Sequence, residues 1–386
     1  MLRGPAFGLT EDNANLLWSP GSPRPAGGFQ TAQRELTALR PTYVRLLVDW
    51  AALQPDPRRP AALEAAASGC ARQVGPCGAY AGIRDELAAI ASQQRAAATG
   101  ATGFQVVIDI YGTPAWAARA PSGCQRSDAA AFSRAPTPAA LAAYRALIRS
   151  LLALAAREGV ALPWWSPWNE PNDPVFLGPQ RSSCAAASLP ASPTLYAELA
   201  RAMAAELRAD GGQHHLLIGE LNAFQTDSHD RTSVAQFVAA LPADVLCLGE
   251  VWSIHAYASW GSATPRVDPV EDLEAALNAR GACARRAQIW ITETGAGAPH
   301  PGSPRPAGAG AEKAGCEAMG AQLMRWYGDP RVGAVFQYTF REDPAFPVGL
   351  IGAELSHLYA TYRLWLAWSR LRLAGGLPPT PAAACA

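Results

Sequence analysis

Strand-like and helical segments alternate eight times along the 386-residue chain, and this alternation limits the possible folds more than any other feature. The strand-like segments are apolar and rich in β-branched or aromatic residues, and they occupy 6–9, 43–48, 104–110, 164–168, 215–221, 251–257, 288–294 and 334–340. The segments between them repeat apolar residues at helical spacing, and they occupy 31–40, 84–99, 137–157, 194–209, 231–241, 270–280, 309–327 and 355–371. Strands that alternate with helices predict a parallel sheet, and eight of each fit a (β/α)8 TIM barrel.

The predicted organisation is one α/β domain over residues 1–372, followed by a poorly ordered Pro/Ala-rich tail over 373–386. A doubly wound open sheet is the alternative fold, but no G-x-G-x-x-G or phosphate-binding loop follows the first strand-like segment. Long loops are expected after the strands, at 51–83, 111–136 and 169–193 among others. In an α/β barrel these strand-to-helix loops lie on the C-terminal face, where functional sites are built.

The composition argues against several classes of partner. Basic and acidic residues each number 32, so the net charge of zero gives no electrostatic reason to expect nucleic acid or an acidic membrane surface. No apolar run approaches the ~18 residues of a membrane span. The cysteines and histidines show no metal-binding spacing, and we predict neither a metal nor a cofactor.

The eight cysteines suggest disulfide bonds, because several of them lie in loops rich in glycine, proline and serine. Candidate pairs are Cys70–Cys77, Cys124–Cys184 and Cys283–Cys316. Cys247 lies in an apolar run and is expected to be a buried thiol. The first residues contain no apolar run of a signal peptide. We therefore expect a secreted or otherwise extracytoplasmic protein whose signal peptide is absent from this sequence; a cytosolic protein with scattered thiols is the alternative.

The stretch "WSPWNEPND" (165–173) places the carboxylate of Glu170 where a strand ends. Prolines on either side prevent the chain from continuing as a strand or helix, so the carboxylate is expected at the C-terminal end of the strand. An apolar wall formed by Trp164, Trp165 and Trp168 could keep this carboxylic acid protonated. The alternative, a solvated acid in a turn, fits poorly after so apolar a segment.

A second carboxylate, Glu293, ends the strand-like segment "IWITETGAG". By strand alternation it shares a face with Ile289 and Ile291, and we expect that face to fill the barrel, while Trp290 and Thr292 occupy the other. A helix-capping acid is the alternative, but a Gly/Pro-rich loop follows instead of a helix. Two carboxylates at strand ends are the minimum equipment for glycoside hydrolysis: one donates a proton, and the other attacks the anomeric carbon or activates water.

The motifs "WNEPN" (168–172) and "ITETG" (291–295), on the fourth and seventh strands, resemble the clan A glycoside hydrolases, most closely family 39 and its relatives. These are retaining (β/α)8-barrel enzymes. The resemblance implies that Glu170 is the acid/base and Glu293 the nucleophile, with carboxyl groups roughly 5–5.5 Å apart. It also implies a carbohydrate substrate with β-glycosidic or α-L-arabinofuranosidic linkages. A transglycosylase with the same intermediate and a non-catalytic carbohydrate-binding barrel are the alternatives.

Four more residues match positions of that clan. The resemblance implies that Asn169 hydrogen-bonds the sugar 2-hydroxyl and that Arg45, on the second strand, holds Glu293 ionised. His255 and Tyr257 match the pair on the sixth strand, whose tyrosine contacts the nucleophile.

The remaining candidates concern substrate contacts and are less specific. Glu220 ends the fifth strand and is either a substrate contact, a support for the site or a structural residue. Tyr111 and Trp116 could stack on sugar rings, although each could equally belong to the core. Many clan A members carry a tryptophan platform after the eighth strand, whereas this chain has Tyr338 and Phe340.

Overall fold

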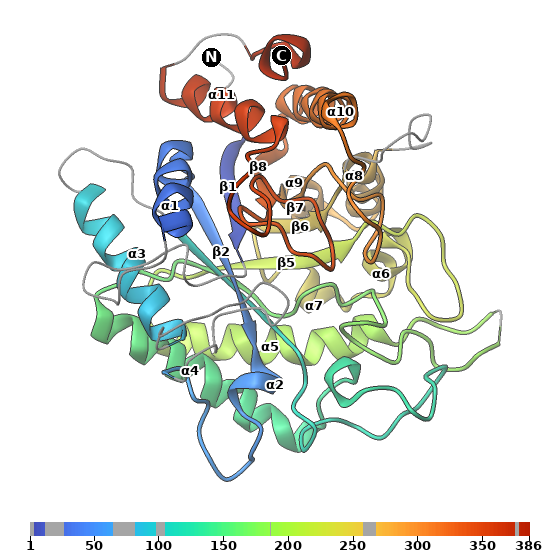
Figure 1. Ribbon diagram of the computed structural model, residues 1–386. Helices are drawn as coiled ribbons and strands as arrows, with labels where there is room; N and C mark the ends of the chain where they lie inside the picture. The colour runs from blue at the N-terminus through green and yellow to red at the C-terminus, as the bar shows by residue number, and fades with distance from the viewer. Residues whose placement is uncertain are drawn as a thin grey trace.

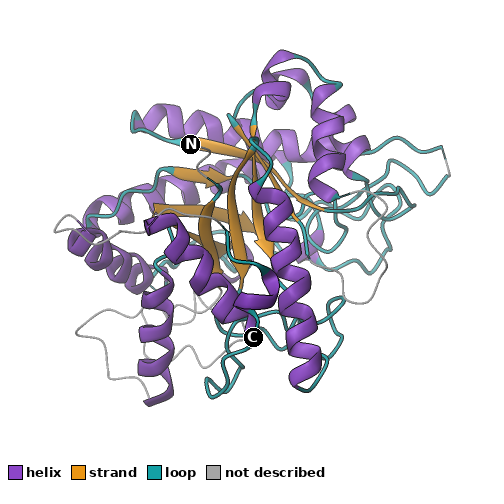
Figure 2. Cartoon of the chain, turned by 90° about the horizontal axis from the view of Figure 1, so that it is seen from above, coloured by secondary structure: helices purple, strands orange, loops and turns teal. Residues whose placement is uncertain are grey.

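Eight parallel strands close into a barrel in the computed structural model, which confirms the predicted fold (Figure 2). The structure describes residues 4–11, 27–64, 82–97, 105–185, 187–257, 268–374 and 378–386. Each strand pairs with the next one in the sequence, and β1 pairs with β8 to complete the circle. The strands are β1 (Ala6–Glu11), β2 (Tyr43–Asp49), β3 (Gln105–Tyr111), β4 (Trp164–Ser166), β5 (His215–Asn222), β6 (Val251–His255), β7 (Gln288–Thr294) and β8 (Val332–Tyr338).

Helices surround the barrel, and those predicted from the sequence are all present (Figure 1). The longer helices are α1 (Gly27–Leu39), α3 (Ile83–Ala97), α4 (Leu141–Glu158), α5 (Ser192–Asp210), α6 (Val234–Ala240), α8 (Pro269–Asn278), α10 (Ala309–Tyr327) and α11 (Ala360–Ala374). The short helices are α2 (Trp50–Leu53), α7 (Ala243–Leu246), α9 (Ala282–Arg286) and α12 (Pro381–Ala384), with 3₁₀ turns at η3 (Ala131–Ser133) and η4 (Pro138–Ala140). The sequence did not predict the short helices because one turn is too short to display a helical period.

Helix α4 shows how local chemistry sets the ends of an element. The Thr137 side chain accepts a hydrogen bond from the Ala140 N–H, and the first turn is 3₁₀ before the α-helix begins. Gly159 ends the helix in the left-handed conformation, at φ 70°. Among the described helices, the segment 138–158 is long and apolar enough to cross a membrane by length and composition. Here its apolar face, including Tyr144 and Leu151, packs into the core of the barrel.

Aromatic side chains fill the N-terminal half of the barrel interior. The Trp290 ring lies 4.6 Å from that of Tyr43 and 4.5 Å from that of Trp164, and Phe336 packs beside them. Polar residues follow further along the same strands, since Arg45 lies two positions after Tyr43. The apolar plug therefore confines any functional site to the C-terminal half of the barrel, which agrees with the predicted location.

The strand face predicted for Glu293 is wrong, although its place at the strand end is right. Trp290 points into the barrel, while Ile289 and Ile291 pack in the layer between strands and helices. The residues Ile291 and Thr294 pair with Val335 and Gln337, so β7 contains one more residue than β8 over this interval. Such a bulge re-aims the side chains beyond it. The bulge brings Glu293 into the interior. Regular alternation would instead have placed it on the outward face, with Ile289 and Ile291.

Three disulfides join described residues. The predicted pair Cys124–Cys184 is confirmed and ties the loops after β3 and β4 together. The expectation of a buried thiol at Cys247 is wrong, because this residue lies exposed at the end of α7 and pairs with Cys283 of α9. Consequently the candidate pair Cys283–Cys316 is wrong as well. Cys70 and Cys77 lie outside the described residues.

The C-terminal segment is attached to the barrel. We expected a poorly ordered tail over 373–386, and the structure instead extends α11 to Ala374 and places α12 beyond it. Cys385 forms a disulfide with Cys316 of α10, and Gly320 of the same helix lies close to Pro381. The chain end therefore lies beside α10 (Figure 1).

Removing the disulfide between the two loops should destabilise the protein without removing its site. We expect the double variant Cys124→Ser/Cys184→Ser to lower the free energy of unfolding by about 2–4 kcal/mol, because the crosslink restricts the unfolded chain. Urea unfolding without reductant would measure this. An unfolding free energy equal to that of the unmodified protein would contradict the expectation.

Candidate active site

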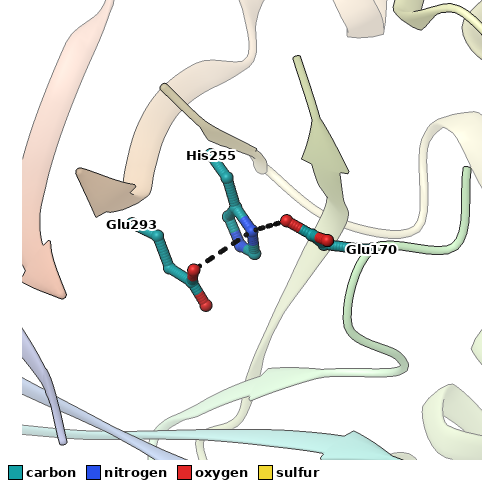
Figure 3. Close-up of side chains that lie close together, drawn as sticks. All are labelled: Glu170, His255 and Glu293. Atoms are coloured by element: carbon teal, nitrogen blue, oxygen red, sulfur yellow. Dashed lines mark hydrogen bonds and ion pairs between the residues drawn. The ribbon is translucent and has the colours of Figure 1, made fainter. Parts of the chain in front are cut away.

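Side chains from the ends of several strands converge in the C-terminal half of the barrel. His255, the last residue of β6, stands between Glu170 and Glu293 (Figure 3). Its Nδ1 atom lies 2.7 Å from Glu170 Oε1 and 3.5 Å from Glu293 Oε2. One oxygen of each glutamate and a ring nitrogen of the histidine all lie within 4.8 Å of one another. The two carboxylates that the sequence singled out are thus neighbours.

Both carboxylate oxygens of Glu293 are held by donors. Arg45 Nη1 donates to Oε1 over 2.7 Å, and the Tyr257 hydroxyl donates to Oε2 over 2.5 Å. These are charge-assisted bonds, which are shorter and stronger than neutral ones. The side chain is therefore fixed in orientation and its negative charge is stabilised.

Arg45 is the buried centre of this network. Its Nη2 atom lies 2.7 Å from both Asp109 Oδ2 and Asn169 Oδ1, and 3.1 Å from Glu220 Oε2. Burial opposes its charge, but Glu220, Asp109 and Glu293 together raise the pKa of Arg45 above its ordinary value. Asp109 was not predicted, although a charged residue within the apolar strand "VVIDI" was a signal for it.

The carboxylates around His255 favour its protonated form. Burial alone would lower the pKa of His255, but Glu293, Glu170 and Glu220 raise it to about 10. Its Nε2 atom lies 2.9 Å from Glu220 Oε2, so the protonated ring donates one bond through each nitrogen. His255, Glu170 and Glu293 are close enough to one another to hold a metal ion, and in this structure both ring nitrogens of His255 lie against glutamate oxygens.

Glu220 is a fully buried carboxylate that contacts both Arg45 and His255. Burial would raise the pKa of Glu220, but Arg45 and His255 lower it to about 2, and the Thr292 hydroxyl donates to it over 2.6 Å. An extra residue in β5, between the pairs of Ile218 and Leu221 with β6, turns this side chain inward.

The exposed fractions separate the roles of the three glutamates. Glu220 is 0% exposed, whereas Glu170 and Glu293 are 9% and 6% exposed. Among the roles left open for Glu220, this placement favours holding His255 and Arg45 over contact with a substrate.

Glu170 lies where the chain turns sharply after β4. Its φ angle of 39° is in the left-handed region, which costs energy for a residue with a side chain and recurs at functional sites. Its Oε2 atom accepts a hydrogen bond from Asn222 Nδ2 over 3.3 Å. The neighbouring Asn169 keeps its backbone paired with β3, through a bond from its N–H to the Ile110 carbonyl.

The apolar wall expected from the three tryptophans is not what surrounds Glu170. Trp164 belongs to the plug in the barrel interior. Trp165 donates its indole N–H to the Leu162 carbonyl, and Trp168 donates to the Phe176 carbonyl. Both of these rings belong to the outer core, so hydrogen-bonding groups rather than tryptophans border the carboxylate.

A further carboxyl group lies next to Glu170. Asn222 Nδ2 also lies 3.0 Å from Asp173 Oδ2. Burial, reinforced by the nearby Glu170, raises the pKa of Asp173 to about 7. Asn222 was not predicted, and its only signal was its position at the end of β5.

Aromatic rings flank the nucleophile candidate. The Tyr257 ring makes edge-on contacts with Phe346, at 4.7 Å, and with Tyr338, at 6.4 Å. Tyr338 also donates its hydroxyl to Asp343. Phe340 is fully buried and cannot form a sugar platform. Phe346 was missed because it lies in an irregular loop that has no period.

Two predicted substrate contacts pack among loop residues. Tyr111 contacts the rings of Phe132 and Phe176, and Trp116 donates its indole N–H to the Gln54 carbonyl. A role for either ring in binding sugar stays a prediction.

Comparison with known proteins supports the fold. No protein-family model matches the sequence, and no curated protein matches it. Among solved structures, the chain is similar to an exo-β-1,4-mannosidase from Opitutaceae bacterium strain TAV5, with 15% identity and a TM-score of 0.53 over 95% of this chain and 59% of that chain. It is also similar to GH5_18 from Streptomyces cattleya in complex with GlcNAc, with 16% identity and a TM-score of 0.54 over 100% and 88%.

A third similar structure is a GH30 endoxylanase from Clostridium papyrosolvens C71, with 11% identity and a TM-score of 0.52 over 96% of this chain and 72% of that chain. The chain thus shares the closed eight-stranded parallel barrel fold of these solved structures. The particular similarity to family 39 stays a prediction.

Proposed function

We propose that the protein is a retaining glycoside hydrolase in which Glu170 is the acid/base and Glu293 the nucleophile. The observation that most supports this is the pair of carboxylates at the C-terminal end of the barrel, which approach so closely that one oxygen of each lies within 4.8 Å of the other. Retaining enzymes separate their carboxyl groups by roughly 5–5.5 Å, whereas inverting enzymes leave roughly 6.5–9.5 Å for a water molecule. The short separation favours direct attack by one carboxylate.

In the first step Glu170, in its protonated form, donates its proton to the glycosidic oxygen. The bond from that oxygen to the anomeric carbon breaks, and the leaving group departs as an alcohol. A Glu293 oxygen forms an ester bond with the anomeric carbon. Arg45 and Tyr257 hold Glu293 in place for this attack.

In the second step the Glu170 carboxylate removes a proton from water. The water oxygen bonds to the anomeric carbon, the ester bond breaks, and Glu293 is again a carboxylate. The anomeric configuration is inverted twice and therefore retained. In the free protein, Arg45 and His255 lie against the glutamates and offset their negative charge.

The substrate proposed is a sugar with a β-glycosidic or α-L-arabinofuranosidic linkage. The solved mannosidase that shares the fold is named for a β-1,4 linkage, which supports this class without selecting a sugar. Tyr257, Tyr338 and Phe346 offer aromatic surface suited to the apolar face of a sugar ring. Asn169 lies beside the nucleophile's partner Arg45, in a position that suits the sugar 2-hydroxyl.

We also propose that the protein works outside the cytoplasm. The three disulfides between described residues support this location, because such bonds persist in oxidising compartments.

The proposed function can be tested by trapping its intermediate. The protein would first be screened on 4-nitrophenyl β-glycosides and α-L-arabinofuranoside, and then incubated with the 2-deoxy-2-fluoro derivative of the sugar it hydrolyses. We expect mass spectrometry to find one fluoroglycosyl group on the peptide that contains Glu293. Proton NMR of the first product should show retained configuration.

Other outcomes would point elsewhere. Products joined to a second sugar instead of water would indicate a transglycosylase. Sugar binding without any product or label would indicate a carbohydrate-binding barrel and contradict the proposal.

A further inference from the structure

Asn222 places its side-chain amide between two carboxyl groups, and this inference rests on the proposed role of Glu170. The amide nitrogen lies 3.3 Å from Glu170 Oε2 and 3.0 Å from Asp173 Oδ2. The Asn222 backbone is held separately, because Asn172 accepts from its N–H over 2.9 Å and donates to its carbonyl over 2.8 Å. Because these bonds already fix the backbone of Asn222, its side-chain amide is available to donate hydrogen bonds to the two carboxyl groups.

Each oxygen of Glu170 then has one donor. His255 Nδ1 lies 2.7 Å from Oε1, and Asn222 serves Oε2. Asp173 is anchored on its far side, where its Oδ1 accepts from the Val175 N–H over 2.9 Å. With carboxyl oxygens on both sides, the Asn222 amide is oriented with its NH₂ group toward them.

The protonated form of Asp173 is compatible with a neighbouring Glu170 that becomes negatively charged during the reaction. The charged groups that face Asp173 are both acidic, Glu170 and Asp230, and burial raises the pKa of Asp173 to about 7. A raised pKa favours the neutral acid, so below neutral pH Asp173 carries no charge. It therefore does not repel Glu170 when Glu170 becomes a carboxylate.

We propose that Asn222, oriented by Asp173, is a positioning residue for the acid/base Glu170. Its N–H bond fixes the Glu170 side chain and stabilises the carboxylate that forms as the proton passes to the leaving group. The effect depends on how much the leaving group needs that proton. It should be large for a poor leaving group and nearly absent for one that departs as a stable anion.

The test compares two leaving groups on the sugar that the wild type hydrolyses. For Asn222→Ala we expect kcat/KM to fall roughly 10- to 100-fold on the phenyl glycoside and to change less than about 3-fold on the 2,4-dinitrophenyl glycoside. Asn278→Ala, a substitution of an exposed asparagine at the end of α8, is the matched control and should leave both values unchanged.

A second variant keeps the shape of the cluster formed by Glu170, Asn222 and Asp173, and removes the titration of Asp173. Asp173→Asn stays neutral at every pH, so an ionisation near pH 7 in the kcat/KM profile of the wild type should disappear in this variant. Because Asp173 of the wild type is mainly neutral well below pH 7, the variant should match the wild-type kcat/KM on the phenyl glycoside there and exceed it above pH 7, where the wild-type Asp173 becomes charged. If Asn222→Ala does not fold, this variant decides the question.

The outcomes separate the two proposals. Equal losses on both glycosides would assign Asn222 a structural role, and no loss on either would remove its role altogether; both results overturn the inference alone. Absence of hydrolysis by the wild type on either glycoside would overturn the proposed function, and the inference with it.

Discussion

Replacing Glu293 with glutamine is expected to lower kcat/KM on aryl glycosides by roughly 10⁴- to 10⁶-fold, the scale of losing a catalytic nucleophile. The amide has nearly the same shape, and it can still accept the bond from Tyr257. It cannot form the ester with the anomeric carbon. Arg45 keeps its contacts with Asp109 and Glu220, so the fold should survive the change.

Steady-state kinetics, with unfolding measured in parallel, would check this result. Glu317→Gln is a suitable control, because Glu317 lies on the surface of α10 with only a loose contact to Lys313, at 3.9 Å. It should retain wild-type activity and stability. If Glu293→Gln hydrolysed the substrate at more than a few per cent of the wild-type rate, another residue would have to be the nucleophile.

The sequence predicted the fold and the two central carboxylates because both depend on regular patterns. Strand and helix periods give the order of elements, and a closed parallel barrel brings all strand ends to one face. Glu170 follows β4 and Glu293 lies at the end of β7, so the two could be expected to meet although they are 123 positions apart in the sequence.

The irregular features could not be predicted, because they break those periods. Bulges in β5 and β7 turn Glu220 and Glu293 into the interior, which alternation alone would not indicate. Asn222 and Asp173 acquire their arrangement only when the end of β5 meets the loop after β4. Phe346 likewise reaches Tyr257 from a loop. Contacts of this kind depend on tertiary packing and leave no local signal.

Removing Arg45 should damage stability and activity together. In Arg45→Met, the buried carboxylates of Asp109, Glu220 and Glu293 lose a shared cation that lies within 2.7–3.1 Å of each. Breaking a buried ion pair from one side costs about 3–5 kcal/mol, since it leaves an uncompensated charge in the interior. We expect a loss of this size in urea unfolding at pH 7. Activity should fall as well, because Glu293 loses the donor to its Oε1 atom.

The pH dependence of this loss distinguishes electrostatics from packing. The pKa of Glu220 is lowered from 4.5 to about 2, with Arg45 as the main cause opposing burial. The stability it contributes is present above pH 4.5 and is lost as the pH falls through 2. The deficit of Arg45→Met should therefore be largest near neutral pH and should narrow below pH 4.5. Arg201→Met, which removes an exposed pair with Asp244, should change the free energy of unfolding little. A deficit for Arg45→Met that did not change with pH would instead mean that the lost side-chain volume, and not the lost charge, destabilises the barrel.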